Sequence, residues 1–379
     1  MNWRIPLADL DFGPEEEAAV LDVLRRRWLT MGAVTEQFEA AFATLVGVPH
    51  ALAVTNCTAA LHLAGAALGW QPGDEVIVPS LTFVATVNAV RYTGATPIFA
   101  DVSSLDDFSL SPDDIAAKIT PRTRAIIVMH YGGYACDMAR INELVQQHGL
   151  DVIEDAAHAP AASLDGRALG TWGTVGCYSF FSNKNMTTGE GGMLVTTDAA
   201  VAEKLRLLRS HGMTTLTWDR HRGHAFSYDV VAPGYNYRID EMRAALGCVQ
   251  LNKLAANNER RRMLDRVYVE SLRSAVPDLT LPYQNHPGVS ACHVRPILLP
   301  PTADRQLFME RLKERGIQTS IHYPPVHQFH YYRALMNGNT PLLPLTEEIA
   351  RREVTLPLYP AMTPSDIELV VAAVAEALS

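Results

Sequence analysis

The chain has 379 residues, 48% of them hydrophobic, which is enough for one large and one small domain with separate cores. Its formal net charge of −9 is spread along the sequence without a basic block, so nucleic acid is not expected as a partner. No run approaches about 18 consecutive apolar residues, and the first residues lack the apolar segment of a signal peptide. We therefore expect a cytoplasmic protein without a membrane partner.

Helices and strands are predicted to alternate along most of the chain. Two helices come first, at 14–27 and 35–45, with a turn at 28–32 between them. From about residue 50, short β-branched runs alternate with helical patterns, which is typical of a mostly parallel sheet covered by helices. The predicted strands are 51–55, 75–79, 96–101, 124–130, 151–154, 175–181 and 193–197. The predicted helices between them are 58–68, 82–92, 199–209 and one that starts at Ser111.

A long helical pattern from 239 to about 272 leads out of this region. Beyond residue 277 the sequence is rich in proline, with short strands and two predicted helices at 304–316 and 364–378. The sequence thus predicts an α/β fold with a large domain, whose central sheet is mostly parallel and flanked by helices, and a smaller C-terminal α/β domain. We place these domains at 1–250 and 251–379, joined by the long helix.

Two polar residues follow predicted strands and suggest cofactor chemistry. Asp155 follows the strand 151–154, and Lys184 follows the strand that carries Ser179, just before the glycine-rich run Thr188–Gly192. Open α/β sheets bind ligands where their strands end. A lysine that can lose its proton, and a carboxylate that can pair with a protonated pyridine nitrogen, are what pyridoxal phosphate chemistry requires. Taken singly, Asp155 could instead be a helix N-cap and Lys184 a surface lysine.

The segment 55–61 joins a predicted strand to a predicted helix. We expect the N–H groups of Thr58 and Ala59 to be free at the positive end of this helix, where a phosphate binds well. The hydroxyls of Thr58 and Ser179 could add donors, and an ordinary N-capped helix is the alternative. Phe83 could stack on an aromatic ring, or it could simply belong to the core.

Two other clusters are open to more than one interpretation. His322, His327 and His330 lie near each other, but their spacing and the intervening prolines do not fit a helical metal site, so no metal is expected. Arg220 and Arg222 lie in a basic stretch, where they could clamp a diphosphate or simply face solvent.

The five cysteines show no CxxC spacing, and we expect reduced, mostly buried thiols.

Taken together, these motifs resemble the DegT/StrS-type sugar aminotransferases, which are pyridoxal phosphate (PLP) enzymes of fold type I in the aspartate aminotransferase superfamily. The resemblance covers nearly the whole chain in order. Its principal segments are 153–158, 179–184, 188–192 and 234–238, supported by 28–32, 73–80, 131–138 and 322–324. One departure is Asn56-Cys57-Thr58, where the family more often has Ser-Gly-Thr.

The resemblance implies a role for each matching residue. Lys184 would be the catalytic base and the lysine that holds PLP as a Schiff base, and Asp155 would pair with the pyridine nitrogen. Asn236 would reach the cofactor phosphate of a neighbouring subunit, which implies a homodimer with active sites at the subunit interface. The other implied cofactor contacts are Thr58, Ala59, Phe83, His158 and Ser179. The residues expected near the substrate are Met31, Arg220, Arg222, His322 and Tyr323.

The function implied by the resemblance is ping-pong transamination. An amino group would move from glutamate or glutamine, through the pyridoxamine phosphate (PMP) form, to a keto sugar, most often one linked to a nucleotide such as dTDP, UDP or GDP. Related dehydratases carry histidine in place of Lys184, so the lysine favours transamination. A cyclitol ketone acceptor, as in aminoglycoside assembly, is the main alternative, and a non-catalytic PLP-binding regulator is a third.

Overall fold

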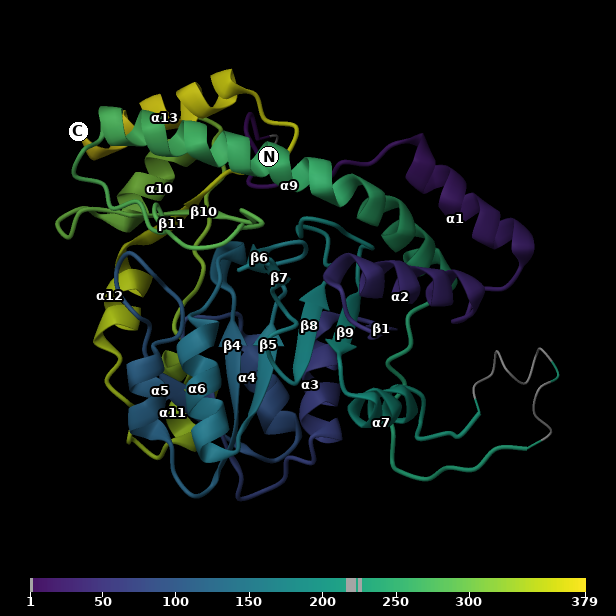
Figure 1. Cartoon of the computed structure of the whole chain (residues 1–379). Coiled ribbons are helices and arrows are strands. Elements are labelled where there is room, and N and C mark those ends of the chain that lie inside the picture. The colour runs from purple at the N-terminus through teal and green to yellow at the C-terminus, as the bar shows by residue number, and fades with distance from the viewer. Residues whose placement is uncertain (1–2, 216–222, 224–226) are drawn as a thin grey trace.

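The computed structural model describes residues 3–215, 223 and 227–379 and contains a central sheet of seven strands (Figure 1). The strands run in the order β1-β9-β8-β5-β4-β2-β3. The pairs from β8 to β3 are parallel, whereas β9 is antiparallel to both of its neighbours. The bounds are β1 His50–Val54, β2 Glu75–Pro79, β3 Thr96–Ala100, β4 Thr123–Met129, β5 Asp151–Asp155, β8 Val175–Ser179 and β9 Gly192–Thr196.

Helices cover both faces of this sheet because its strands alternate their side chains between two apolar layers. In β4, for example, Ile126 and Val128 join one buried cluster, and Ala125 and Ile127 join the other. Helices α2 (Ala33–Val46), α5 (Pro112–Lys118) and α6 (Met138–His148) contribute to the first cluster. Helices α3 (Cys57–Ala67), α4 (Val84–Tyr92) and α7 (Ala199–Arg209) contribute to the second.

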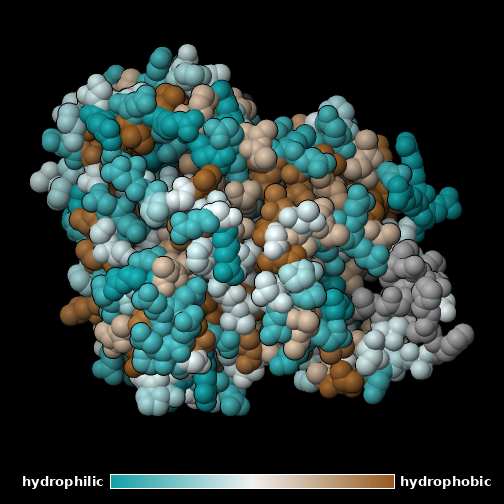
Figure 2. Space-filling model, viewed as in Figure 1, coloured by the Kyte–Doolittle hydropathy of each residue, from teal (hydrophilic) through white to brown (hydrophobic). Residues whose placement is uncertain are grey.

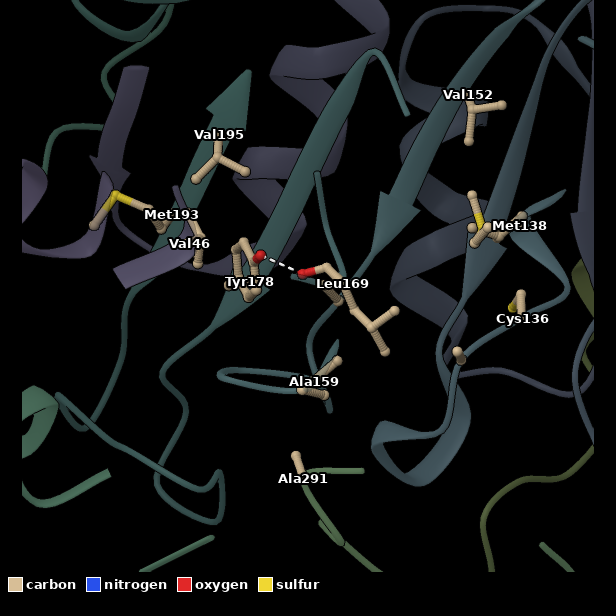
Figure 3. Close-up of a cluster of buried hydrophobic side chains, with 14 of the residues drawn as sticks. Val46, Cys136, Met138, Val152, Ala159, Leu169, Tyr178, Met193, Val195 and Ala291 are labelled. Atoms are coloured by element: carbon tan, nitrogen blue, oxygen red, sulfur yellow. Dashed lines mark hydrogen bonds between the residues drawn. The ribbon is translucent and has the colours of Figure 1, made fainter. Parts of the chain in front are cut away.

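The first apolar layer includes a buried tyrosine of β8. Figure 3 shows Tyr178 among Val46, Met193 and Val195, with its hydroxyl donating a hydrogen bond to the backbone carbonyl of Leu169. The hydroxyl is therefore satisfied although Tyr178 is fully buried. A small hairpin, β6 (Ser163–Leu164) and β7 (Arg167–Ala168), and the 3-10 turn η1 (Tyr131–Gly133) complete this part of the chain.

The long predicted helix is α9, which runs from Glu241 to Ala275 and crosses from the sheet to the C-terminal elements (Figure 1). There β10 (Arg295–Leu298) pairs antiparallel with β11 (Glu353–Leu356). The other C-terminal elements are α10 (Arg305–Glu314), η2 (Val326–Gln328), α11 (His330–Leu335), α12 (Pro344–Arg352) and α13 (Pro364–Leu378). The helix α1 (Pro14–Arg26), near the N-terminus of the chain, packs on α9.

The chain passes more than once between the hydrophobic core around the large sheet and the core of the C-terminal elements. Ile5 belongs to the C-terminal core and forms a β-bridge with Ile317, whereas Val326 and Leu343 pack into the second apolar layer of the large sheet. We propose that the chain forms two domains, 1–250 and 251–379, that α9 joins them, and that these crossings fasten one to the other.

The described part of the chain contains no helix that is long and apolar enough to span a membrane. The five cysteines are free thiols, and all but the half-buried Cys248 are buried. This agrees with the expectation of reduced, mostly buried thiols.

Candidate active site

A cavity of about 450 Å³ opens where the parallel strands of the large sheet end. Met129 ends β4, Asp155 ends β5 and Ser179 ends β8, and all three line the cavity. His322 and Tyr323 close it from the C-terminal part of the chain. The other lining residues that the sequence singled out are Thr58, Phe83, His158 and Lys184. Segments that are far apart in the sequence thus meet in one site.

Asp155 forms part of the cavity wall and is held by two hydrogen bonds. Its Oδ2 accepts from the Thr86 hydroxyl at 2.7 Å, and its Oδ1 accepts from the N–H of Ala157 at 3.1 Å. Burial raises the pKa of Asp155, and the two hydrogen bonds partly oppose this by stabilising the carboxylate. The carboxylate is 4% exposed, and a cationic partner in the cavity would favour its ionised form.

Lys184 lies in the loop between β8 and β9, at the same strand ends as Asp155. Burial of the amine lowers the pKa of Lys184 from 10.5 to about 8, although the negative charge of Asp155 opposes this shift. A sizeable fraction of the amine is therefore neutral near physiological pH, which a nucleophile or a base requires.

A buried polar chain behind Lys184 was not predicted from the sequence. The amine Nζ lies 3.5 Å from Nε2 of His293, and Nδ1 of His293 lies 2.9 Å from Oδ1 of Asn185. The side chain of Asn185 in turn donates to Oδ1 of Asn258 at 2.7 Å. Asn258 lies in the middle of α9 and His293 just before β10, so only the tertiary structure brings these residues together. Neither residue belongs to a motif, and no sequence signal marked them.

The turn that enters α3 is capped, which corrects one expectation. The side chain of Asn56 accepts a hydrogen bond from the N–H of Ala59 at 2.8 Å, so this N–H is not free, and Ala59 does not line the cavity. The prediction of a free N–H at Ala59 was wrong because Asn56 is a good N-cap residue whose side chain reaches the third residue of the helix. Cys57 and Thr58, in the first turn, do line the cavity.

His158 and Tyr323 form a hydrogen-bonded pair at the cavity wall. The N–H of Gly132 donates to Nδ1 of His158 at 3.2 Å, so Nε2 carries the proton of the neutral ring and donates to the Tyr323 hydroxyl at 3.0 Å. Burial lowers the pKa of His158 well below its usual value, which keeps the ring neutral. The Tyr323 hydroxyl hydrogen is then free to point elsewhere in the cavity.

Phe83 is not a core residue. Its side chain is 57% exposed, it lines the cavity, and its ring centroid lies 6.0 Å from that of Tyr323. Of the two interpretations of Phe83, the exposed position favours a ligand contact, because an aromatic ring of the core would be buried.

His322 is oriented by the buried side chains of Glu353 and Thr355. Oγ1 of Thr355 lies 2.5 Å from Oε1 of Glu353 and 2.8 Å from Nδ1 of His322. The N–H of His322 donates to Oε2 of Glu353 at 2.8 Å. Burial lowers the pKa of His322 to about 4 and raises that of Glu353 to about 8. Because Nδ1 is already bonded to Thr355, Nε2 of the neutral His322 ring is the atom left to form a hydrogen bond in the cavity.

The remaining predicted residues lie elsewhere. Met31 is buried and does not line this cavity, and Asn236 is exposed and pairs with Ser210 in a β-bridge. Arg220 and Arg222 lie outside the described residues. Within the described ranges, no three His, Cys, Asp or Glu side chains are placed to hold a metal ion.

The chain matches the model of the "DegT/DnrJ/EryC1/StrS aminotransferase family" over residues 11–375. It belongs to this family. The family match makes the chain an aminotransferase, and it covers both the large sheet and the C-terminal elements described above.

Similar proteins match over nearly their whole length. The spore coat polysaccharide biosynthesis protein SpsC of Bacillus subtilis is 39% identical over 379 residues, which cover 99% of this chain and 96% of SpsC. The aminotransferase TlmJ from Streptoalloteichus hindustanus is 36% identical, with a TM-score of 0.91 and coverage of 99% and 98% of the two chains. DesI, solved in the presence of its TDP-sugar product, is 31% identical, with a TM-score of 0.88 and coverage of 100% and 93%.

The family is PLP-dependent, and the cavity fits this cofactor. Spr1654 from Streptococcus pneumoniae, 25% identical with a TM-score of 0.90, has been solved in PLP and PMP forms that cover 99% or more of this chain and 99% of Spr1654. The donor set here offers an amine, a carboxylate and a helix N-terminus around one space of suitable size. A Cβ at Gly192 would lie 2.6 Å from the carbonyl carbon of Asn56, so only glycine lets the lysine loop close against the α3 turn.

Proposed function

We propose that this enzyme moves an amino group from glutamate or glutamine to a nucleotide-linked keto sugar. The observation that carries the proposal is the placement of a lysine with a pKa near 8 and a buried carboxylate in one cavity at the strand ends. Bound PLP supplies a cationic ring that absorbs the electrons of a substrate carbanion. All other steps fall to the protein's own side chains.

Lys184 and Asp155 have complementary roles in this proposal. The Asp155 carboxylate would pair with the pyridine nitrogen of the cofactor and keep it protonated, while the Thr86 hydroxyl holds the carboxylate in place. The Lys184 amine would hold the cofactor and, once free, would take the proton from the substrate carbon. Because the same amine works in reverse, it serves both half-reactions.

The turn into α3 is proposed to hold the cofactor phosphate. N–H groups in the first turn of a helix have no partner within the helix, and those of Cys57 and Thr58 lie beside the cavity. The hydroxyls of Thr58 and Ser179 add donors. The exposed Phe83 ring, which lines the cavity, is proposed to cover the cofactor ring.

The Asn236 side chain is proposed to act in a second subunit. It lies outside the cavity of its own chain and is exposed. Nearby Val230 and Val231 are 53% and 57% exposed, which is unusual for valines and suits a surface that a partner covers. We therefore propose a homodimer in which Asn236 reaches the cofactor phosphate of the other subunit.

The keto sugar is proposed to bind at the C-terminal side of the cavity. There the Tyr323 hydroxyl donates, and Nε2 of the neutral His322 ring can form one further hydrogen bond, which suits the hydroxyl groups of a sugar. The structure of DesI with its TDP-sugar product, at 31% identity, supports a nucleotide-linked acceptor. Arg220, Arg222 and Met31 remain proposed contacts of the acceptor.

Spectroscopy and mass spectrometry test the catalytic part of this proposal. Purified enzyme reduced with borohydride is expected to carry the cofactor on the peptide that contains Lys184, and the Lys184→Ala variant is expected to carry none. Glutamate and glutamine are then added separately, and loss of the PLP absorbance identifies the amino donor. Attachment at another lysine, or a spectrum that neither amino acid changes, would contradict the proposal.

The acceptor is tested with the isolated PMP form. It is mixed with TDP-, UDP- and GDP-linked keto sugars and with a keto-cyclitol, and the return of PLP absorbance is followed. We expect a nucleotide-linked sugar to restore the absorbance fastest. Faster turnover of the keto-cyclitol would replace the proposed acceptor and leave the aminotransferase assignment intact.

A further inference from the structure

We infer that His293 is a positioning residue for Lys184, because its imidazole is fixed as one tautomer that presents a lone pair to the lysine amine. The inference rests on the proposed role of Lys184 and adds a residue to it. It starts from the contact of 3.5 Å between Nζ of Lys184 and Nε2 of His293. His293 is 5% exposed, so water does not compete freely for this contact.

The direction of the hydrogen bonds determines the tautomer. The amide nitrogen of Asn185 donates to the backbone carbonyl of Ala291 and to Oδ1 of Asn258, each at 2.7 Å. Both of its hydrogens are used, so Oδ1 of Asn185 is the atom that faces His293, and it can only accept. Nδ1 of His293 must therefore carry the hydrogen, and in the neutral ring Nε2 is left with a lone pair that faces Lys184.

The far end of this chain is also fixed. The amide nitrogen of Asn258 donates to the backbone carbonyl of Pro160 at 2.9 Å, so its Oδ1 is available to accept from Asn185. Asn185 and Asn258 are 5% and 1% exposed. A flipped amide would leave buried groups unsatisfied, which costs about 1–3 kcal/mol per group. Asn185 and Asn258 thus fix the orientation of the His293 ring that faces Lys184.

The surroundings keep His293 uncharged. Burial is the main cause that lowers the pKa of His293 well below its usual value, and nearby cations add to the effect. The guanidinium of Arg261 donates to the backbone carbonyl of His293 at 3.4 Å, and its positive charge opposes a second one on the ring. The other titratable groups near the pair are Asp155, Cys57, His158 and His322.

The contact orients the lone pair of the lysine. An amine nitrogen has two hydrogens and one lone pair in a roughly tetrahedral arrangement, so donating one hydrogen to Nε2 turns the lone pair away from His293. When the amine takes a proton, the ammonium keeps this bond, and the bond becomes stronger because the donor is charged. His293 therefore favours the protonated amine that proton transfer produces.

The test measures the pKa of Lys184 in cofactor-free protein. Acetic anhydride labels neutral amines, and mass spectrometry follows labelling of Lys184 against pH. Because His293 stabilises the ammonium, His293→Phe is expected to lower the midpoint by about 0.5–1 pH unit. His293→Gln places an amide oxygen at the same number of bonds from Cα and is expected to restore it. His148→Phe, at an exposed histidine, is the control and should leave the midpoint unchanged.

Each result of this experiment decides the inference. A midpoint that rises in His293→Phe would mean that the ring is charged and repels the lysine. An unchanged midpoint, or equal shifts in the Phe and Gln variants, would mean that the lone pair does not act on the amine. Any of these results overturns the inference.

A kinetic measurement separates positioning from a merely structural role. With glutamate deuterated at Cα, His293→Phe is expected to lower kcat about tenfold, to leave KM within about twofold and to raise the isotope effect. Borohydride trapping is repeated on each variant. Cofactor found on Lys184 together with an unchanged isotope effect would reject the role of His293 alone, whereas cofactor on another residue would reject the proposed role of Lys184.

Discussion

The amine of Lys184 is buried in an environment that disfavours its protonated, charged form. Its pKa in the folded protein is about 8, below the ordinary value of 10.5. Between these two values the unfolded chain holds a proton that the folded chain has released, so stability increases with pH across this window. Below about pH 8 both states are protonated, and the cost of burying the ammonium is present in full.

This cost leads to a prediction for the cofactor-free protein. Lys184→Met is expected to be more stable than the wild type at pH 7, and the advantage should shrink by at most about 1.4 kcal/mol per pH unit between pH 8 and 10.5. Urea unfolding at several pH values measures this difference. The exposed Lys204→Met is the matched control and should show no such trend. A stability difference independent of pH would contradict the depressed pKa.

Thr86 stabilises the charged form of Asp155 through one hydrogen bond. Its hydroxyl is buried and donates to Oδ2 of Asp155, so Thr86→Val removes a donor that stabilises the carboxylate and raises the pKa of Asp155 further. We expect kcat to fall about tenfold in Thr86→Val, and about 10²–10⁴-fold in Asp155→Asn, which removes the charge altogether. Thr93→Val, at the end of the same helix, should retain wild-type kcat. A larger loss of kcat in Thr86→Val than in Asp155→Asn would contradict the proposal that Thr86 acts by stabilising the Asp155 carboxylate.

At the scale of elements, the N-terminus of α2 is capped by another helix. Its N-cap residue, Gly32, has no side chain, and the carboxylate of Glu241 at the start of α9 accepts instead. Glu241 takes hydrogen bonds from the N–H groups of Gly32, Val34 and Thr35 and from the Thr35 hydroxyl. The negative charge also lies at the positive end of α2, so one side chain joins the two helices.

Removing this carboxylate is expected to destabilise the protein. Glu241→Ala leaves several buried donors without an acceptor, and we expect it to lower the free energy of unfolding by about 2–3 kcal/mol. Chemical unfolding monitored by circular dichroism measures the change. Glu270→Ala, at an exposed position of the same helix, is the control. If both variants unfolded alike, Glu241 would not be the cap that holds α2.

Elements with strong local signals were predictable from the sequence. The apolar runs of β2 and the caps of α5 and α13 set their bounds locally, so β2 spans the predicted residues and Ser111 caps α5 as expected. The pairing of β10 with β11 was not predictable, because these strands are short and more than fifty residues apart. The same reasoning applies to the site. Lys184 and Asp155 could be found from the sequence because they follow predicted strands. His293 and Asn258 could not, because only the tertiary packing that involves α9 brings them near Lys184.

At the scale of the whole molecule, the proposed dimer makes each site depend on two chains. Figure 2 shows hydrophobic residues on the outer face over α1 and α2, where Leu21 and Leu24 are 47% and 45% exposed. Together with the exposed valines beside Asn236, they suit a surface that a second copy covers. Light scattering is expected to give twice the mass of the 41.6 kDa chain.

Mixing two inactive variants tests the shared site. Lys184→Ala lacks the amine, and Asn236→Ala lacks the residue proposed to cross the interface. After subunit exchange, half of the dimers are mixed and one of their two sites is intact, so activity should recover to about a quarter of the wild type. A mixture of Lys184→Ala with Asp155→Asn is the control, because both losses fall in the same subunit's site and the mixture should remain inactive. No recovery in the first mixture would place Asn236 in its own chain's site or outside both.

The cavity combines the turn before α3, the loop between β8 and β9, and His322 and Tyr323 near the other end of the chain. Because no N-terminal fragment contains all of these parts, the complete cavity forms only after both cores have formed and met. The visible absorbance of bound PLP reports the part of the cavity that the large sheet supplies, and transamination activity reports the complete cavity. The recovery of this activity after dilution from urea would time the last assembly step, and free cofactor in excess would draw the equilibrium toward the finished structure.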